Sequence, residues 1–184
     1  MSLRPSAYKR VCVCVCVCVC VCASEQDIFS LYHLKRSLKY ISKLSNFLIP
    51  VIGWSMFLTG HVPLRRTDRK SQIRCLKTCV DLLRTGSSLI FFPEGTRSTD
   101  GKLAAFKKGA FSVAAKVGAR VVPVTIIGAG ELMRSGKETQ LYRGSVKLVV
   151  HEPIACGDAN VAMKEAEQII TREYEAHRGG AAST

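Results

Sequence analysis

The segment from Phe91 to Ser98, FFPEGTRS, combines residue types that can bind a phosphate group. Its Gly95 lets the backbone approach a ligand closely. Arg97 can grip a phosphate with paired donors, and Glu94 can accept a hydrogen bond from a hydroxyl group or orient the arginine. From the residue types alone, a polar turn with a surface ion pair is an equally good interpretation of this segment. The segment is therefore a candidate anion-binding loop.

A second candidate is the basic stretch from Gly60 to Arg74, GHVPLRRTDRKSQIR, in which Asp68 is the only acid. It suits a phosphate, a lipid headgroup or nucleic acid, although a solvated face at the start of a helix would look the same. The whole chain carries 27 Lys and Arg against 14 Asp and Glu, a net charge of +13, which favours an anionic partner. The aromatic residues or recognition helix of nucleic-acid modules are missing beside this cluster, so nucleic acid is the least favoured partner.

Six of the 9 cysteines lie in one run, VCVCVCVCVCVC, from Val11 to Cys22. In a strand, cysteines on the same face would have Cα atoms roughly 6.6 to 6.8 Å apart, at the far edge of disulfide geometry. An extended segment also cannot converge on one metal ion. Because a GT dinucleotide repeat read in frame encodes Val-Cys, we interpret the run as a translated simple repeat. We expect Cys75, Cys79 and Cys156 to be ordinary reduced thiols.

Strands and helices are predicted to alternate after this run, which indicates a single α/β domain with a largely parallel sheet flanked by helices. The expected strands are 38–42, 88–92, 120–128 and 145–151, and the expected helices are 71–85, 104–117 and 158–177, the last capped by Asp158. We divide the chain into a basic start with the repeat at 1–22, a domain at 23–177 that lacks its true beginning, and a disordered tail at 178–184.

The stretch from Leu44 to Gly60 carries no charge. Pro50 and Gly53 interrupt it, so it is not expected to span a membrane as one helix. Two placements remain open: the membrane interface, with the basic cluster facing lipid headgroups, or the core of the domain.

The segment FFPEGTRS, with GHVPLRR upstream and VVPVTIIG downstream, resembles the 1-acylglycerol-3-phosphate acyltransferases, the PlsC-type lysophosphatidic acid acyltransferases, and their plant and algal members in particular. The similarity covers roughly residues 23–174. It implies transfer of an acyl group from acyl-CoA or acyl carrier protein to the 2-hydroxyl of lysophosphatidic acid, which gives phosphatidic acid. Lys107, one turn into the helix expected at 104–117, would add positive charge to the site. The resemblance assigns motif positions to Arg66, Glu94, Gly95, Arg97 and Pro123.

The family's motif His-x-x-x-x-Asp is incomplete. Asp27 matches its aspartate, but the histidine that acts as the base would stand at position 22, where the chain has Cys22. A thiol with a pKa near 8.5 is not an equivalent base. We therefore expect the family's activity for an intact gene product and little or no transferase activity for this chain.

The other histidines are poor replacements for the missing base. His33 lies six residues beyond Asp27, which is about 240° around a helix. His61, beside the basic cluster, is a weak candidate that we expect at the surface. His151 and His177 are expected to be structural or exposed.

The resemblance implies no metal and no cofactor, since the acyl donor is a co-substrate. It implies lysophosphatidic acid and a membrane surface as partners, in the plastid or the endoplasmic reticulum. The alternative function is a non-catalytic domain that binds anionic lipid through Arg66 and Arg97. A nucleic-acid binder, the third possibility, would show affinity that falls steeply with salt and no preference for phosphatidate lipids.

Overall fold

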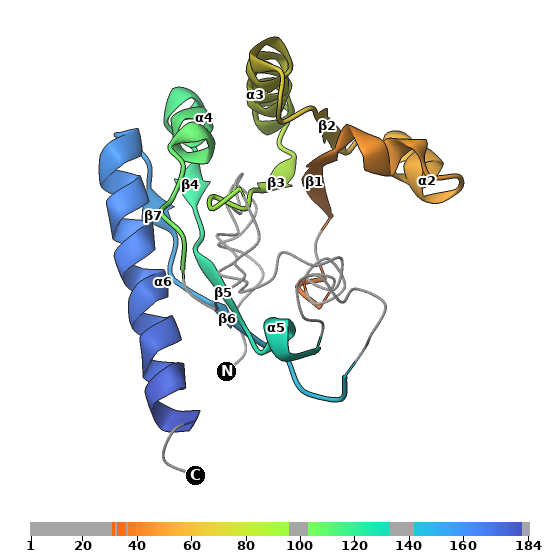
Figure 1. Cartoon of the computed structure of the whole chain (residues 1–184). Coiled ribbons are helices and arrows are strands. Elements are labelled where there is room, and N and C mark those ends of the chain that lie inside the picture. Colours follow the sequence, from red (N-terminus) through yellow and green to blue (C-terminus); the bar gives the residue numbers. More distant parts are fainter. Residues whose placement is uncertain (1–30, 32, 36, 96–102, 133–141, 182–184) are drawn as a thin grey trace.

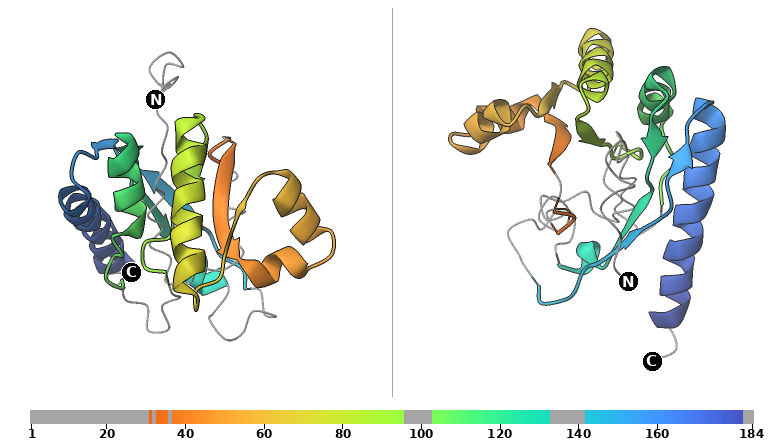
Figure 2. Two further views of the ribbon diagram at one scale, coloured as in Figure 1. Left: turned by 90° about the horizontal axis from the view of Figure 1, so that it is seen from above. Right: turned by 180° about the vertical axis from the view of Figure 1, so that it is seen from behind.

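A computed structural model describes residues 31, 33–35, 37–95, 103–132 and 142–181 of the 184-residue chain. Strands and helices alternate along this part of the chain (Figure 1). Across the molecule, helices α6, α4 and α3 follow one another side by side, and α2 lies at the opposite end from α6 (Figure 2). The predicted α/β class is confirmed.

Three parallel strands form the sheet of the first half of the chain: β1 (Leu38–Lys43), β2 (Val62–Leu64) and β3 (Ser88–Ile90). Their order is β2-β1-β3, with Ile41 opposite Val62 and Leu38 opposite Ser88. Because parallel strands point the same way, the segments that follow β2 and β3 emerge at the same edge of the sheet. This edge brings the basic cluster to the predicted anion-binding loop.

Successive residues of β3 point to opposite faces and serve two cores. Leu89 belongs to the larger core, with residues of α3, α4 and α6, whereas Ile90 belongs to a smaller core with Val124 and Ile126. All of these side chains are almost fully buried. The strand that leads into the loop is thus fixed on both faces.

Helix α3 (Arg69–Arg84) connects β2 to β3. Asp68 caps its first turn by accepting a hydrogen bond of 2.9 Å from the Lys70 N–H. Gly86 follows the helix with φ +86°, a conformation that glycine adopts at low cost. The predicted helix is confirmed, and Cys75 and Cys79 lie on its buried face as free thiols, as Cys156 does elsewhere in the core.

Helix α4 (Gly109–Val117) begins later than the predicted start at Ala104. The Ala104 N–H donates instead to the Glu94 side chain, at 3.0 Å. The Lys107 N–H donates to the carbonyl oxygen of Pro93, at 2.8 Å. These donors hold residues 104–107 against the loop, so the helix starts only after them.

The predicted strand 120–128 is divided in two. Pro123, which has no N–H to donate, separates β4 (Arg120–Val121) from β5 (Val124–Ile127). Strand β4 pairs with β7 (Ile154–Ala155) and β5 pairs with β6 (Lys147–Val150), both antiparallel. The described strands therefore form one parallel three-stranded sheet in the first half of the chain and two antiparallel pairs in the second.

Two helices complete the second half, α5 (Ala129–Leu132) and α6 (Ala159–Ala181). The predicted cap of α6 is confirmed, because the Asp158 carboxylate accepts hydrogen bonds from the N–H groups of Asn160 and Val161. These two bonds lower the pKa of Asp158. Helix α6 continues beyond its predicted end at His177.

The uncharged stretch 44–60 forms a short 3-10 helix, η1 (Leu44–Leu48), and the helix α2 (Ile52–Leu58). Only Gly53 is buried in α2, and η1 buries none of its residues. The alternative that this stretch belongs to the core is therefore wrong. Among the described residues, no helix is long and apolar enough to cross a membrane.

Candidate functional site

The loop after β3 is held in a fixed turn. The Gly95 N–H donates to the carbonyl oxygen of Phe92 at 3.1 Å, and Gly95 has φ +67°. Glu94 is only 4% exposed, and its Oε2 accepts the hydrogen bond from Ala104. The buried carboxylate thus ties the two ends of the loop together, which keeps the Gly95 backbone in place.

Arg66 joins this loop from the neighbouring element. Its guanidinium Nη1 donates to the carbonyl oxygen of Gly95 at 2.7 Å. The carbonyl oxygen of Arg66 in turn accepts a hydrogen bond of 2.6 Å from Gln72 Nε2, in the first turn of α3. The structure therefore brings together Arg66, Glu94 and Gly95, three of the residues predicted from the sequence.

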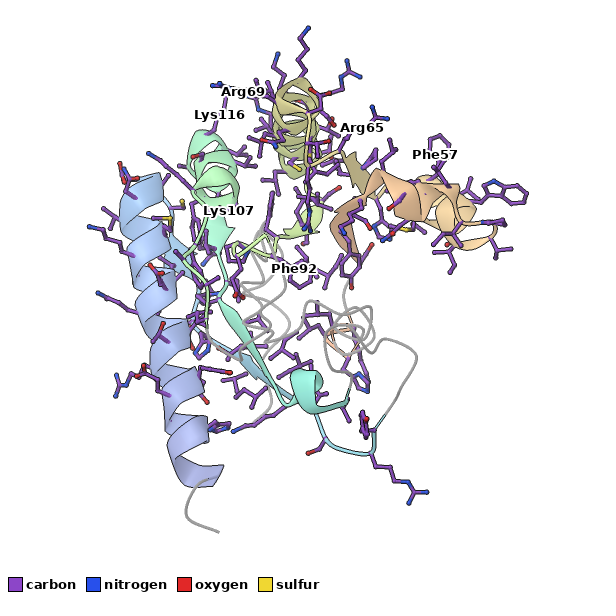
Figure 3. All side chains as sticks on the ribbon, in the orientation of Figure 1. Phe57, Arg65, Arg69, Phe92, Lys107 and Lys116 are labelled. Carbon is purple, nitrogen blue, oxygen red and sulfur yellow. The ribbon has the colours of Figure 1, made fainter. Side chains whose placement is uncertain are left out.

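Lys107 also lies close to Gly95. A Cβ atom at Gly95 would stand 2.5 Å from Lys107 Nζ and 3.1 Å from its Cδ, so the lysine packs directly on this glycine and would have to shift for any larger residue. Figure 3 shows Lys107 just before α4, on the stretch that the Glu94 carboxylate holds. We call Arg66, Glu94, Gly95 and Lys107 the Gly95 site.

The Gly95 site can bind an anion. The Arg66 and Lys107 side chains are exposed, whereas the one carboxylate, Glu94, is buried and already accepts a backbone hydrogen bond. A phosphate group can be bound by two exposed cationic side chains beside a glycine, where the ligand can come close to the backbone. Among the described residues, no three His, Cys, Asp or Glu side chains gather as a metal site.

Three of the predicted residues lie outside the described residues: Cys22, Asp27 and Arg97. The roles assigned to them stay predictions. Pro123 is described, and it lies between two short strands with its carbonyl oxygen accepting the His151 N–H at 3.0 Å.

His61 is not a surface residue as expected. It is half-buried, its Nδ1 accepts a hydrogen bond of 3.0 Å from the Tyr40 N–H, and its ring meets the Tyr40 ring edge-on at 5.2 Å. Burial, and then the nearby Lys39, lower the pKa of His61. His61 precedes β2 whereas Arg66 follows it, so the two lie at opposite ends of the strand.

The remaining histidines have the structural or exposed positions that the sequence predicts. His151 Nε2 is hydrogen bonded to Thr125 Oγ1 at 2.9 Å, and burial lowers its pKa. His177 accepts a hydrogen bond from Lys147. His33 is exposed.

Sequence reasoning missed Gln72 as part of the site. Its amide fixes the backbone at Arg66, six residues earlier in the chain. The sequence did offer a signal for this contact. Gln72 lies in the first turn of a predicted helix, where polar side chains often form hydrogen bonds with nearby backbone groups.

Known proteins that are similar to this chain are acyltransferases. A family model described as Acyltransferase matches residues 14–127, a range that holds position 22, Asp27 and the loop. A 1-acyl-sn-glycerol-3-phosphate acyltransferase of Chlamydomonas reinhardtii is 64% identical over 128 residues, 70% of this chain and 39% of that protein. A chloroplastic enzyme of the same name from Arabidopsis thaliana is 50% identical over 149 residues, 81% of this chain and 42% of that protein.

The fold is also similar to a solved one. The crystal structure of the 1-acyl-sn-glycerophosphate acyltransferase PlsC from Thermotoga maritima matches with a TM-score of 0.74 and 31% identity, over 84% of this chain and 63% of that one. The chain spans about two fifths of the length of these curated relatives. Because the family model covers more than half of its residues, the chain belongs to the acyltransferase family.

Proposed function

We propose that the chain comes from an enzyme that transfers an acyl group to the 2-hydroxyl of lysophosphatidic acid and so makes phosphatidic acid. One observation carries this proposal: Arg66 donates to the carbonyl oxygen of Gly95, and Lys107 lies close to the same glycine. This arrangement supplies two cations for the phosphate of the substrate. The relatives named as 1-acyl-sn-glycerol-3-phosphate acyltransferases support the choice of substrate.

The reaction requires one bond to form and one to break. The substrate hydroxyl oxygen bonds to the acyl carbon of a thioester, carried by acyl-CoA or acyl carrier protein, and the carbon–sulfur bond breaks. The hydroxyl proton passes to a base and then to the leaving thiolate. Arg66, Arg97 and Lys107 hold the phosphate during this step, and no metal or cofactor takes part.

The base is the missing part of this chain. The family's histidine would stand at position 22, where Cys22 is found, and Asp27 would orient it. We therefore propose that the chain as written binds lysophosphatidic acid but transfers acyl groups poorly. The absence of the histidine is also the observation that favours the second candidate, a non-catalytic domain that binds anionic lipid.

The names of the relatives support a proposed place of action. Those from Arabidopsis thaliana and Brassica napus are named as chloroplastic, which favours the plastid over the endoplasmic reticulum. Because the substrate and product are lipids, we propose that the enzyme works at a membrane surface.

The Gly95 site is tested by the binding of lysophosphatidic acid to purified protein, measured by calorimetry with a short-chain form below its micelle concentration. Arg66→Ala removes a charge-assisted contact of about 1.5 to 3 kcal/mol, so affinity should fall roughly 10- to 100-fold. Arg172→Ala, an exposed change on α6, is the matched control and should bind normally. Monoacylglycerol, which lacks the phosphate, should bind both proteins equally. An equal loss of affinity in Arg66→Ala and Arg172→Ala would contradict the proposal that the Gly95 site binds the phosphate.

A further inference from the structure

The segment 48–58 exposes a run of large apolar side chains. Trp54 is 72% exposed, Phe57 is 76% exposed and Leu58 is 83% exposed. Leu48 and Val51 are exposed beside them. We call these five residues the α2 face. Apolar side chains scattered singly over a surface are normal, whereas a contiguous group indicates an interaction site.

No other helix or strand described in the structure covers the α2 face. Helix α2 packs closely only on η1, and it projects from the end of the molecule (Figures 1 and 2). The contact with η1 is tight, because a Cβ atom at Gly53 would overlap the carbonyl oxygen of Phe47. The helix is thus seated firmly on its neighbour while its apolar side chains face outward. Phe57 shows this orientation in Figure 3.

The charges around the α2 face are mostly positive, and Asp68 is the one acid among the residues that line the adjoining groove. From Ile28 to Thr67 the sequence has no Asp or Glu. A groove of about 830 Å³ between α2 and α3 is lined by Phe47 and Phe57 on one side and by Arg65, Lys70 and Arg74 on the other. Adjacent apolar and cationic groups of this kind suit a bilayer with anionic headgroups. The aromatic rings would enter the boundary between headgroups and acyl chains, and the cations would stay at the lipid phosphates.

We propose that the α2 face docks the protein onto an anionic lipid bilayer, with α2 lying in the interface and the basic residues of the groove on the headgroups. A helix of 7 residues is about 10 Å long, so it can lie in the interface but cannot span the bilayer. The inference rests on the proposed function in one respect, since it names the surface through which the enzyme meets its lipid substrate.

The position of Arg66 agrees with this orientation. A second groove, of about 510 Å³, is lined by Leu44 and Leu48 of η1 and by Arg65 and Arg66 beyond β2. Its lining includes Leu48 of the α2 face and Arg66 of the Gly95 site. A lipid can therefore place its phosphate at Arg66 while its chain stays near the apolar residues of η1.

Trp54 makes this docking directly measurable, because it is the only tryptophan of the chain. The unaltered protein is titrated with vesicles of phosphatidylcholine mixed with phosphatidylglycerol, and with vesicles of phosphatidylcholine alone. We expect the Trp54 emission to shift to shorter wavelength with the anionic vesicles, and brominated lipids to quench it. The neutral vesicles should produce a much weaker effect.

Two pairs of variants separate the apolar part from the charged part. The double change Phe57→Ser with Leu58→Ser keeps the Trp54 probe and should weaken vesicle binding by roughly tenfold or more, whereas Val161→Ser, an exposed change on α6, should leave it unaltered. Arg65→Ala with Lys70→Ala should weaken it roughly fivefold per cation, and the weakening should disappear in high salt. The control is Lys164→Ala with Arg172→Ala, which removes the same number of positive charges from α6 and should leave vesicle binding nearly unaltered.

Three results would overturn the proposal. The first is an unchanged Trp54 emission with anionic vesicles. The second is equal binding by the Phe57 and Leu58 variant and the Val161 variant. The third is a Trp54 environment that depends on protein concentration and not on lipid, which would assign the α2 face to a second copy of the chain. Because the calorimetric test of Arg66 uses no vesicles, either proposal can fail while the other stands.

Discussion

At the scale of single residues, the sequence indicated the members of the Gly95 site but not their contacts. The order of residues in FFPEGTRS pointed to Glu94 and Gly95, and the resemblance to the family pointed to Arg66. That Glu94 is buried and binds the Ala104 N–H could not be predicted, because this depends on a chain segment ten residues away. The position of His61 was unpredictable for the same reason, since its partner Tyr40 lies 21 residues earlier.

The buried contact of His61 predicts a dependence of stability on pH. The hydrogen bond from Tyr40 needs a neutral Nδ1, and the pKa of His61 is lowered from 6.5. Just below pH 6.5 the unfolded chain therefore binds more protons than the folded one at this residue. The free energy of unfolding should thus fall as the pH is lowered through this window, and level off below the folded pKa.

His61→Asn keeps an acceptor for the Tyr40 N–H but does not titrate. Urea unfolding of both proteins between about pH 7 and pH 5 should therefore show a shallower fall for the variant. The lowered pKa of His151 acts in the same window but is common to both proteins, so it cancels in the comparison. Parallel curves for the two proteins would show that His61 titrates normally.

At the scale of elements, periodicity predicted β1, α3, β3 and α6 close to their observed bounds, because each combines an apolar pattern with its own start or stop signal. The short strands β2 and β7 escaped prediction, since two or three residues carry no periodic pattern. The start of α4 was misplaced because residues 104–107 have helical composition but give their N–H groups to the loop. Tertiary contacts with the loop thus set the start of α4.

The end of α4 gives a test of backbone conformation alone. Gly118 has φ +66°, and a Cβ atom there would meet nothing within 4 Å. Gly118→Ala should therefore lower the free energy of unfolding by about 1 to 2 kcal/mol, through the left-handed conformation and not through a clash. Urea denaturation measures this loss.

Gly157 provides the matched control. A Cβ atom at Gly157 would also meet nothing within 4 Å, but the φ of this residue is not in the left-handed region. Gly157→Ala should leave stability nearly unchanged or raise it slightly, because alanine restricts the unfolded chain. A loss as large as that of Gly118→Ala would mean that some other feature of these glycines matters.

At the scale of the whole molecule, we propose that the basic charge, the α2 face and the Gly95 site act together on a lipid substrate. The net charge of +13 predicted an anionic partner, and one groove is lined both by Leu48 of the α2 face and by Arg66 of the Gly95 site. The sequence left the stretch 44–60 open between core and interface, because apolar composition suits both. The exposure of nearly all residues of η1 and α2 in the folded chain decided between them.

The central claim is that this chain belongs to a lysophosphatidic acid acyltransferase whose base is missing at Cys22. The most direct measurement is the formation of phosphatidic acid from acyl-CoA and lysophosphatidic acid, for the chain as written and for Cys22→His. The histidine is introduced alone and, in a second protein, with the upstream segment of the Chlamydomonas reinhardtii relative in place of residues 1–21.

The account predicts little product from the chain as written and a rise of roughly 100-fold or more with the histidine, the usual contribution of a general base. Adding Asp27→Asn should cancel much of this gain, since the aspartate orients the imidazole. If both proteins with histidine form no more phosphatidic acid than the original chain, the assignment of the base to position 22 is wrong.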